Sequence, residues 1–396
     1  MYRRELVEQI KSRADEERRF MQIVVGPRQT GKTTAVLQAL EALEIKNHYI
    51  SADEPNVASR EWLVNEWEQA RLLQRRAGGE LLLVIDEIQK VKDWSSSVKF
   101  LWDEDTRKKI PLKVILTGSS ALLLQKGMAE SLMGRYEILY CPHWNFKECG
   151  DAFGYGLDEF LFFGGYPGAA ALKNDEDRWA RYIGASIVEP TISQDILMME
   201  EVRKPALLRA LFMLGAGYSA QELSYTKILG RLQDAGNTVT LSHYLELLGK
   251  ANILCGLQKF SKNKIQARQS SPRFLVYDTS LMTYADGTSR KRFLENKDDR
   301  GRLTESAVGA YLLARGKEEG FEVFWWRERS HEVDFVIRRG SAVTAIEVKS
   351  GRVRKIGGGD EFLKRHPSAF RLVVGSAHCG LEEFLSGQFE LFNREG

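Results

Sequence analysis

Eight residues near the amino terminus have the spacing of a phosphate-binding loop. They are Gly26-Pro27-Arg28-Gln29-Thr30-Gly31-Lys32-Thr33, and they fit the pattern G-x-x-x-x-G-K-[ST]. Glycines let the backbone wrap phosphates with its N–H groups pointing inward. Lys32 would reach the β- and γ-phosphates, the Thr33 hydroxyl would bind Mg²⁺, and Thr34 would complete the loop's contacts. The pattern predicts a site for ATP and Mg²⁺; the alternative is a glycine-rich strand-to-helix turn with a surface lysine.

Two carboxylates follow the apolar run Leu81–Ile85 directly, which is the second requirement of such a site. Asp86 would hold the shell of the Mg²⁺ ion beside Thr33. Glu87, one residue further on, would polarise the attacking water as a general base. The alternative is a buried strand that ends in a solvated acidic turn.

Two further residues are candidates for the same chemistry. Thr117 follows the run Leu112–Leu116, and ligands of open α/β sheets bind at the carboxyl ends of the strands. Thr117 or the nearby Ser119 would touch the γ-phosphate or the attacking water, unless these residues form an ordinary turn. Arg135 would act as an arginine finger supplied by a neighbouring subunit, but a plain surface arginine fits equally well.

A second group of residues with metal-binding chemistry lies near the carboxyl terminus. Asp334 precedes the sequence Glu347-Val348-Lys349 by thirteen positions, the D…E-x-K arrangement of restriction-endonuclease-like nucleases. Adjacent strands would bring Asp334 and Glu347 together as oxygen ligands of Mg²⁺, and Lys349 would orient a water beside Glu347. Glu305 would add a helix-borne acid. The alternatives are a salt-bridged pair of strands, or the same fold without cleavage.

The elements that would position the first site alternate between strands and helices over about 150 residues, the pattern of a parallel α/β sheet. The expected strands are Met21–Val25, His48–Ser51, Leu81–Ile85, Leu112–Leu116 and Tyr136–Tyr140.

A winged helix is predicted in the middle of the chain, as three helices followed by a hairpin. The helices are Ala220–Ser224, Lys227–Asp234 and Ser242–Lys250, and the strands are Ala251–Phe260 and Arg273–Tyr277. The third helix would enter the major groove of DNA. Cations around the hairpin would neutralise phosphates, unless the hairpin packs on the ATPase instead: Lys259, Lys262, Lys264, Arg268 and Arg273.

The predicted elements that carry the carboxyl-terminal acids are the helices Thr304–Arg315 and Asp360–Arg365 and four strands, with Asn296–Arg302 as a linker. The strands are Phe321–Arg327, Glu332–Arg338, Val343–Lys349 and Phe370–Gly375. The whole is an α/β protein, divided into an ATPase domain (1–155), a helical connector (156–204), a winged helix (205–285) and a restriction-endonuclease-like domain (290–396).

With these motifs, the chain resembles prokaryotic AAA-superfamily P-loop ATPases fused to a winged-helix and restriction-endonuclease-like region. The resemblance covers nearly the whole chain and implies this fold and an ATP site. It rests on residues 26–34, Asp86-Glu87-Ile88-Gln89, Thr117-Gly118-Ser119-Ser120 and Gly164-Gly165-Tyr166-Pro167.

The composition describes a globular protein, because 43% of the 396 residues are hydrophobic and 28% are charged. No apolar run reaches the ~18 residues of a membrane span, and no secretory signal is recognised. The four cysteines are scattered without metal-binding spacing, so a reducing cytoplasm is expected. The net charge of +3 does not by itself indicate nucleic acid.

These observations predict an ATP-hydrolysing protein that acts on DNA and controls a Mg²⁺-dependent phosphodiesterase in its last hundred residues. One alternative is an ATP-dependent switch or scaffold whose carboxyl-terminal domain binds DNA or a protein partner without cleavage, and Arg135 would then serve a homo-oligomer. Another is a motor that acts on DNA without cutting it.

Overall fold

The structure is a computed structural model that divides into two compact units, Met1–Pro142 and His143–Gly396, which are described separately. The described residues are 1–53, 59–118, 132–197, 202–232, 236–261, 270–349 and 358–393, apart from the side chain of Leu294. Five residues singled out above lie outside these ranges: Ser119, Ser120, Lys262, Lys264 and Arg268.

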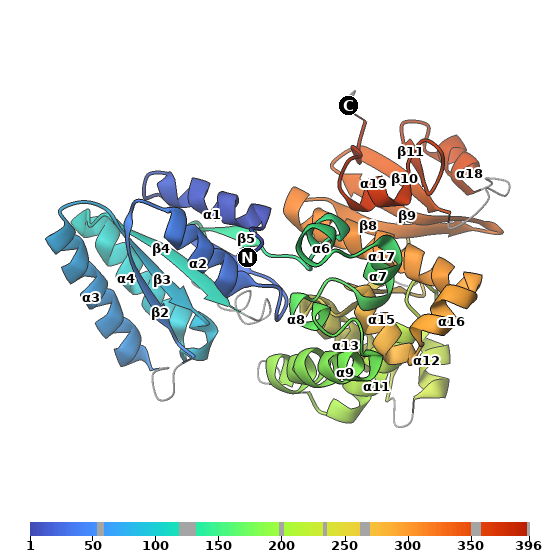
Figure 1. The fold of residues 1–396 in the computed structure, drawn as a ribbon, viewed down its shortest axis with the longest axis horizontal. Helices are drawn as coiled ribbons and strands as arrows, with labels where there is room; N and C mark the ends of the chain where they lie inside the picture. Colours follow the sequence, from blue (N-terminus) through green and yellow to red (C-terminus); the bar gives the residue numbers. More distant parts are fainter. Residues whose placement is uncertain are drawn as a thin grey trace. The chain divides into compact units, whose positions relative to one another are not determined.

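The first unit is built on a five-stranded parallel sheet in the order β2-β3-β4-β1-β5, which confirms the predicted fold class of this part (Figure 1). β1, β3 and β4 are apolar along most of their length and buried on both faces, as central parallel strands are. The strands are β1 (Met21–Val25), β2 (Lys46–Ser51), β3 (Leu81–Asp86), β4 (Leu112–Gly118) and β5 (Tyr136–Tyr140).

Helices cover both faces of this sheet, since successive strand side chains point to opposite sides. Ile23 packs with α3 and α4, whereas Val24 packs with α1 and α2. The result is a three-layer unit. Because both faces of its sheet are covered, the polar groups that chemistry needs lie at the ends of the strands. The helices are α1 (Glu5–Asp15), α2 (Lys32–Ala42), α3 (Arg60–Ala77), the 3₁₀ turn η1 (Ile88–Lys90) and α4 (Trp94–Lys108).

The second unit begins with a helical part that ends in a short antiparallel hairpin of β6 (Leu254–Leu257) and β7 (Arg273–Val276). Three helices precede the hairpin: α11 (Pro205–Gly217), α12 (Tyr225–Arg231) and α13 (Thr238–Lys250). The other helical segments are α6 (Phe146–Phe153), α7 (Leu157–Phe163), α8 (Pro167–Ala170), α9 (Glu176–Tyr182), η2 (Ile183–Val188), η3 (Thr191–Ile196), α15 (Thr279–Asp286) and α16 (Arg290–Glu295).

A four-stranded mixed sheet in the order β11-β10-β9-β8 completes the second unit (Figure 1). β8, β9 and β10 are antiparallel neighbours, and β11 runs parallel to β10. Phe362 of α18 packs against one face, and Phe335 of β9 approaches Gly309 of α17 from the other. The elements are α17 (Lys297–Glu319), β8 (Glu322–Glu328), β9 (His331–Arg339), β10 (Ala342–Val348), α18 (Gly358–Arg365), β11 (Phe370–Val374) and α19 (Leu381–Leu385).

Two predicted elements are wrong. The helix expected at Ala220–Ser224 is a turn in which Ala220 is left-handed, with a φ of 62°, and Glu222 bridges to Arg273. The first of the three helices is α11 instead. The linker expected at Asn296–Arg302 forms the first turns of α17, because the Asn296 side chain accepts hydrogen bonds from the first backbone N–H groups of that helix.

Candidate functional site

The predicted phosphate-binding loop lies between β1 and α2, in the middle of the sheet of the first unit. β1 ends at Val25, and α2 begins at Lys32, so Thr33 and Thr34 lie in the first turn of the helix. A helix amino terminus at this place directs unpaired N–H groups and the positive end of the helix dipole at an anion. The strand and the helix that the motif requires are therefore both present.

Gly26 is required by a close approach of backbone. A Cβ atom at this position would lie 2.1 Å from the carbonyl oxygen of Cys141. The Cys141 N–H in turn donates to the Val25 carbonyl over 2.7 Å, which extends the pairing of β5 with β1. The loop thus leaves the sheet at a point where only a glycine fits.

Arg4, which was not identified from the sequence, holds the phosphate-binding loop in place through hydrogen bonds. Its buried guanidinium donates to the carbonyl oxygens of Thr30 and Pro142, each over 3.1 Å, and to the Sγ atom of Cys141. Thr30 also donates its hydroxyl to the Pro27 carbonyl. No local motif identifies Arg4, because its partners are 26 or more residues away in the sequence.

The Lys32 ammonium group lies inside the loop. It donates to the carbonyl oxygens of Pro27 and Gly26, over 2.5 and 3.2 Å, and the side chain is buried. A bound phosphate would offer the same ammonium a charged acceptor, which makes a stronger hydrogen bond than a neutral carbonyl.

Asp86 is the point at which the predicted nucleotide-site residues come together. Its Oδ2 atom accepts a hydrogen bond from the Thr33 hydroxyl over 2.9 Å, and its Oδ1 atom accepts one from the Thr117 hydroxyl. All three side chains stand at the carboxyl edge of neighbouring strands or in the loop beside them. A hydroxyl and a carboxylate oxygen side by side are the hard donors that Mg²⁺ prefers, so the residues present fit this ion.

Tyr49 of β2 adds a third donor to this carboxylate and was also missed. Its hydroxyl donates to Oδ2 of Asp86 over 3.0 Å. Burial, and then the charge of Asp86, raise the pKa of Tyr49 well above its ordinary value, so the phenol remains a donor. The pairing of β2 with β3 explains the contact, because Tyr49 lies opposite Val84, two residues before Asp86, and this pairing was not predicted from the sequence.

Glu87 follows Asp86 and adopts left-handed backbone, with a φ of 54°. Its carboxylate accepts a hydrogen bond from Nε2 of Gln89 over 2.6 Å and remains partly accessible. The Glu87 side chain is therefore held next to Asp86 and stays accessible to solvent. A residue that activates a water needs this accessibility.

Arg135 does not join these residues within the chain. It precedes β5 at the amino-terminal edge of the sheet, whereas the loop lies at the carboxyl-terminal edge of β1. Its guanidinium makes a two-pronged ion pair with Asp103, over 2.7 and 3.0 Å. A role in a neighbouring subunit stays a prediction.

The carboxyl-terminal acids gather around an arginine that lies on the hairpin. Arg273 of β7 donates to Glu305 of α17, to Glu332 of β9 over 2.9 Å and to the main-chain carbonyl of Asp334. The Asp334 carboxylate lies 3.9 Å from the same guanidinium and accepts a hydrogen bond from the N–H of Val348. Arg273 is buried, so the prediction that it binds a phosphate at the surface is wrong.

Glu347 is held by a different arginine. Oε2 of Glu347 accepts hydrogen bonds from Nε and Nη2 of Arg371, over 3.0 and 2.6 Å, and Arg371 also pairs with Asp360. Lys349 lies in electrostatic range of Glu305 and Asp334. Among the residues that the structure describes, no cluster of three or more potential ligands is arranged to hold a metal ion.

Burial changes the acidity of this group. It raises the pKa of Glu305 to about 8 and raises the pKa of Asp334, although Arg273 opposes both shifts. Burial thus shifts both carboxyls toward the neutral form even with the Arg273 cation beside them.

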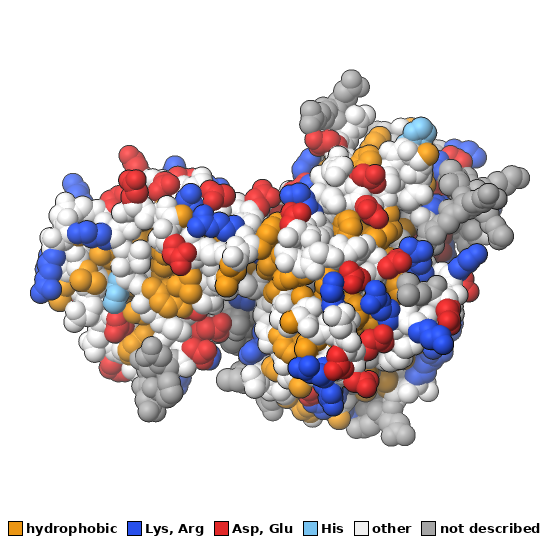
Figure 2. Space-filling view, in the orientation of Figure 1, with side chains coloured by type: hydrophobic (Ala, Val, Ile, Leu, Met, Phe, Trp, Pro, Cys, Tyr) orange, Lys and Arg blue, Asp and Glu red, His pale blue; other side chains and the backbone are white. Residues whose placement is uncertain are grey.

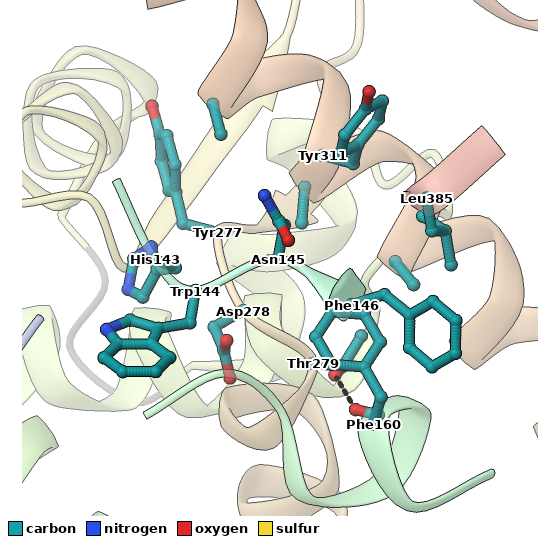
Figure 3. A pocket seen from close by; sticks show the side chains of 13 residues that line it. His143, Trp144, Asn145, Phe146, Phe160, Tyr277, Asp278, Thr279, Tyr311 and Leu385 are labelled. Carbon is teal, nitrogen blue, oxygen red and sulfur yellow. Dashed lines mark hydrogen bonds between the residues drawn. The ribbon is translucent and has the colours of Figure 1, made fainter. Parts of the chain in front are cut away.

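A pocket with aromatic walls lies elsewhere in the second unit, between the segment that starts at His143, the start of α15 and α17 (Figure 3). His143 and the Tyr166 hydroxyl are 2.9 Å apart, and Thr279 donates to the Phe160 carbonyl. Asp278 is buried at the pocket and accepts the N–H groups of Gly165 and Ser280. The Gly164-Gly165-Tyr166-Pro167 stretch therefore has a packing role here.

Fold and site together define an ATPase-like domain of the AAA type in the first unit. Residues 18–150 match the family model of an AAA domain. Residues 155–292 and 300–377 match two domains of unknown function, DUF8612 and DUF4143.

Two curated relatives extend over most of the chain. An uncharacterized protein of Methanocaldococcus jannaschii is 24% identical over 80% of this chain and 72% of its own length. An uncharacterized protein of Haemophilus influenzae is 22% identical over 83% of this chain and 82% of its own length. A similar solved structure is the Walker-type ATPase PABY2304 of Pyrococcus abyssi, with 16% identity and a TM-score of 0.49. The match covers 72% of this chain and 95% of the Pyrococcus chain.

No helix in the described segments combines the length and the apolar character that crossing a bilayer requires.

Proposed function

We propose that the protein hydrolyses ATP at residues 26–34 and uses this reaction to control the action of its second unit on DNA. The observation that carries the first half is the convergence of the Thr33 and Thr117 hydroxyls on the Asp86 carboxylate beside the loop. This arrangement joins a phosphate cradle to a Mg²⁺ ligand set at one edge of the sheet.

Each residue has a part in the proposed reaction. The backbone of the loop and Lys32 bind the phosphates and balance their charge. Thr33 and Asp86 would hold Mg²⁺, which when bound supplies further positive charge to the β- and γ-phosphates. Glu87 accepts a proton from the attacking water. Thr117 contacts the γ-phosphate or the attacking water and orients it.

Phosphate release from ATP tests this half with three proteins. The wild type should hydrolyse ATP only with Mg²⁺. Lys32→Ala should lose binding, whereas Glu87→Gln should bind ATP and hydrolyse it at least ~100-fold more slowly, since general-base catalysis contributes that much. A Glu87→Gln protein with wild-type turnover would contradict the assignment of the base.

The second half of the proposal rests on the order of elements in the second unit. The succession α11, α12, α13, β6 and β7 is that of a winged helix, which supports DNA as the partner. The succession α17, β8, β9, β10, α18 and β11, with β11 parallel to β10, is that of a restriction-endonuclease-like domain. Charge alone adds little, because acidic and basic side chains are mixed on the face drawn in Figure 2.

Two versions of this half make different predictions for DNA. In the first, Asp334, Glu347 and Lys349 form a Mg²⁺-dependent phosphodiesterase. In the second, the domain binds DNA or a protein partner without cleavage. The arginine partners of the acids favour the second version, because Arg371 already bonds one carboxylate oxygen of Glu347 and Arg273 one of Glu305, where a metal ion would compete with them.

Incubation with Mg²⁺, ATP and linear, nicked and single-stranded DNA separates the versions. We expect retention of the DNA in a gel-shift assay and no cleavage. Metal-dependent cleavage that Glu347→Ala abolishes, with ATPase activity intact, would restore the nuclease version. Mass measurement with and without ATP tests the assembly in which Arg135 would take part.

A further inference from the structure

The strongest unexplained feature of the second unit is a buried cation among three acids from distant parts of the chain. Arg273 is only 4% exposed, and it lies on β7, whereas Glu305 lies on α17 and Glu332 and Asp334 lie on β9. A charge buried this deeply is tolerated only when it is paired and hydrogen-bonded.

The guanidinium of Arg273 is bonded at each of its nitrogens. Nε donates to the Ala220 carbonyl over 3.0 Å, Nη1 to Glu332 over 2.9 Å, and Nη2 to Glu305. A carboxylate oxygen of Asp334 lies 3.9 Å from Nη2. The planar fork of an arginine matches several carboxylates at fixed angles, which a lysine cannot do.

We propose that Arg273 takes the place of a divalent metal ion among Glu305, Glu332 and Asp334. The side chain thereby excludes a metal from this acidic group and ties the β6–β7 hairpin to the sheet that carries the acids. Arginine stays protonated in proteins, so it keeps one positive charge among the acids at all times, but it cannot activate a water as a metal does. The inference rests on the non-cleaving version of the proposed function and supplies a physical reason for it.

The partner of Glu347 supports the same inference. Glu347, one of the three acids expected at the metal, is paired with Arg371 of β11, and Arg371 is shared with Asp360 of α18. Two arginines of the chain therefore take up the acids that the D…E-x-K pattern would give to one ion.

Counting bound Mn²⁺ on the full chain without nucleotide, by electron paramagnetic resonance, tests the inference. Wild type and Glu305→Gln should bind the same number of ions. The three acids are not arranged to hold an ion while they are spread around the guanidinium. With that side chain removed they can close on one, so Arg273→Met should gain about one ion per chain. The double variant Arg273→Met/Glu305→Gln should lose that ion again.

Arg327→Met is the matched control, since Arg327 bonds the outer oxygen of Glu332 at the surface and does not contact Glu305. It should gain no ion. A wild-type Mn²⁺ ion that disappears in Glu305→Gln would overturn the inference, and so would a folded Arg273→Met that gains none.

Two further measurements keep the test decisive. Should Arg273→Met fail to fold by circular dichroism, the comparison of wild type with Glu305→Gln still decides whether an ion occupies the site. If the wild type failed to retain DNA or to hydrolyse ATP, the proposed function would be contradicted. The inference about Arg273 would not, because neither result changes the number of bound ions.

Discussion

At the scale of single residues, the Asp86 carboxylate is the most densely bonded group of the candidate ATP site. Three hydroxyls, from Tyr49, Thr33 and Thr117, converge on its two oxygens. Thr33 and Thr117 would exchange this bond for contacts to the ion or the nucleotide, but Tyr49 belongs to the neighbouring strand. Tyr49 is therefore a positioning residue that keeps Asp86 oriented while its other partners change.

Tyr49→Phe should lower ATP turnover. Losing one hydrogen bond to a charged acceptor removes about 1.5 kcal/mol or more, which is roughly tenfold in rate if the bond persists in the transition state. Steady-state phosphate release at several Mg²⁺ concentrations measures this, and a raised Mg²⁺ requirement is expected. Tyr136→Phe, at the opposite end of the sheet, is the control. Equal turnover of Tyr49→Phe and wild type would remove Tyr49 from the site.

The residues found from the sequence and those that were missed differ in the range of their contacts. The loop and Asp86 could be predicted because each is a short motif at the end of an apolar strand. Arg4 and Tyr49 act on partners 26 and 37 positions away, so their roles depend on the topology of the sheet. Arg273 has basic neighbours in the sequence and acidic neighbours in space, and so its role was mispredicted.

Asp278 gives the second unit a pH-dependent stability. Burial raises its pKa, although the hydroxyl of Ser280 and the N–H groups of Gly165 and Ser280 lower it. A carboxyl with a raised pKa in the folded state stabilises fully below its unfolded pKa of about 4, and this contribution disappears as the pH rises through the folded value. Urea denaturation should show wild type losing stability relative to Asp278→Asn as the pH rises from 4. A difference that does not change with pH would contradict this.

At the scale of elements, strands and helices with a clear apolar pattern were predicted well, whereas a short helix without tertiary information was not. The strands around the loop are confirmed, and α13 extends the predicted helix Ser242–Lys250 at its amino end. The helix expected at Ala220–Ser224 failed because Ala220 and Glu222 bond to the hairpin strand β7, a tertiary contact that overrides local propensity.

The turn at residues 164–167 shows how one element depends on another. A Cβ atom on Gly165 would lie 2.2 Å from the Trp144 carbonyl and 3.2 Å from Asp278. Gly165→Ala should therefore destabilise the second unit by about 1–3 kcal/mol, the usual effect of overpacking. Thermal unfolding measures this. Gly156→Ala is the control, because its Cβ would meet open space, and equal melting temperatures of the two variants would contradict the packing role.

At the scale of the whole molecule, the first unit has what an independent domain needs. Two apolar cores lie on the two faces of its sheet. Arg4 joins the start of the chain to the Pro142 carbonyl at the end of the unit, so both ends are fixed by a bond within it. The residues proposed to bind ATP all lie before Pro142.

A fragment of residues 1–142 should consequently fold alone and bind ATP with Mg²⁺. We expect one cooperative transition in urea by tryptophan fluorescence, because buried Trp67, Trp94 and Trp102 belong to its core. Saturating nucleotide should move this transition upward by RT ln(1 + [L]/Kd), which is about 2.7 kcal/mol at a hundredfold excess over Kd. Lys32→Ala in the same fragment should fold but lose the shift. If the fragment folds and binds ATP but hydrolyses it more slowly than the full chain, then the second unit contributes to the reaction; equal rates would confine catalysis to the first.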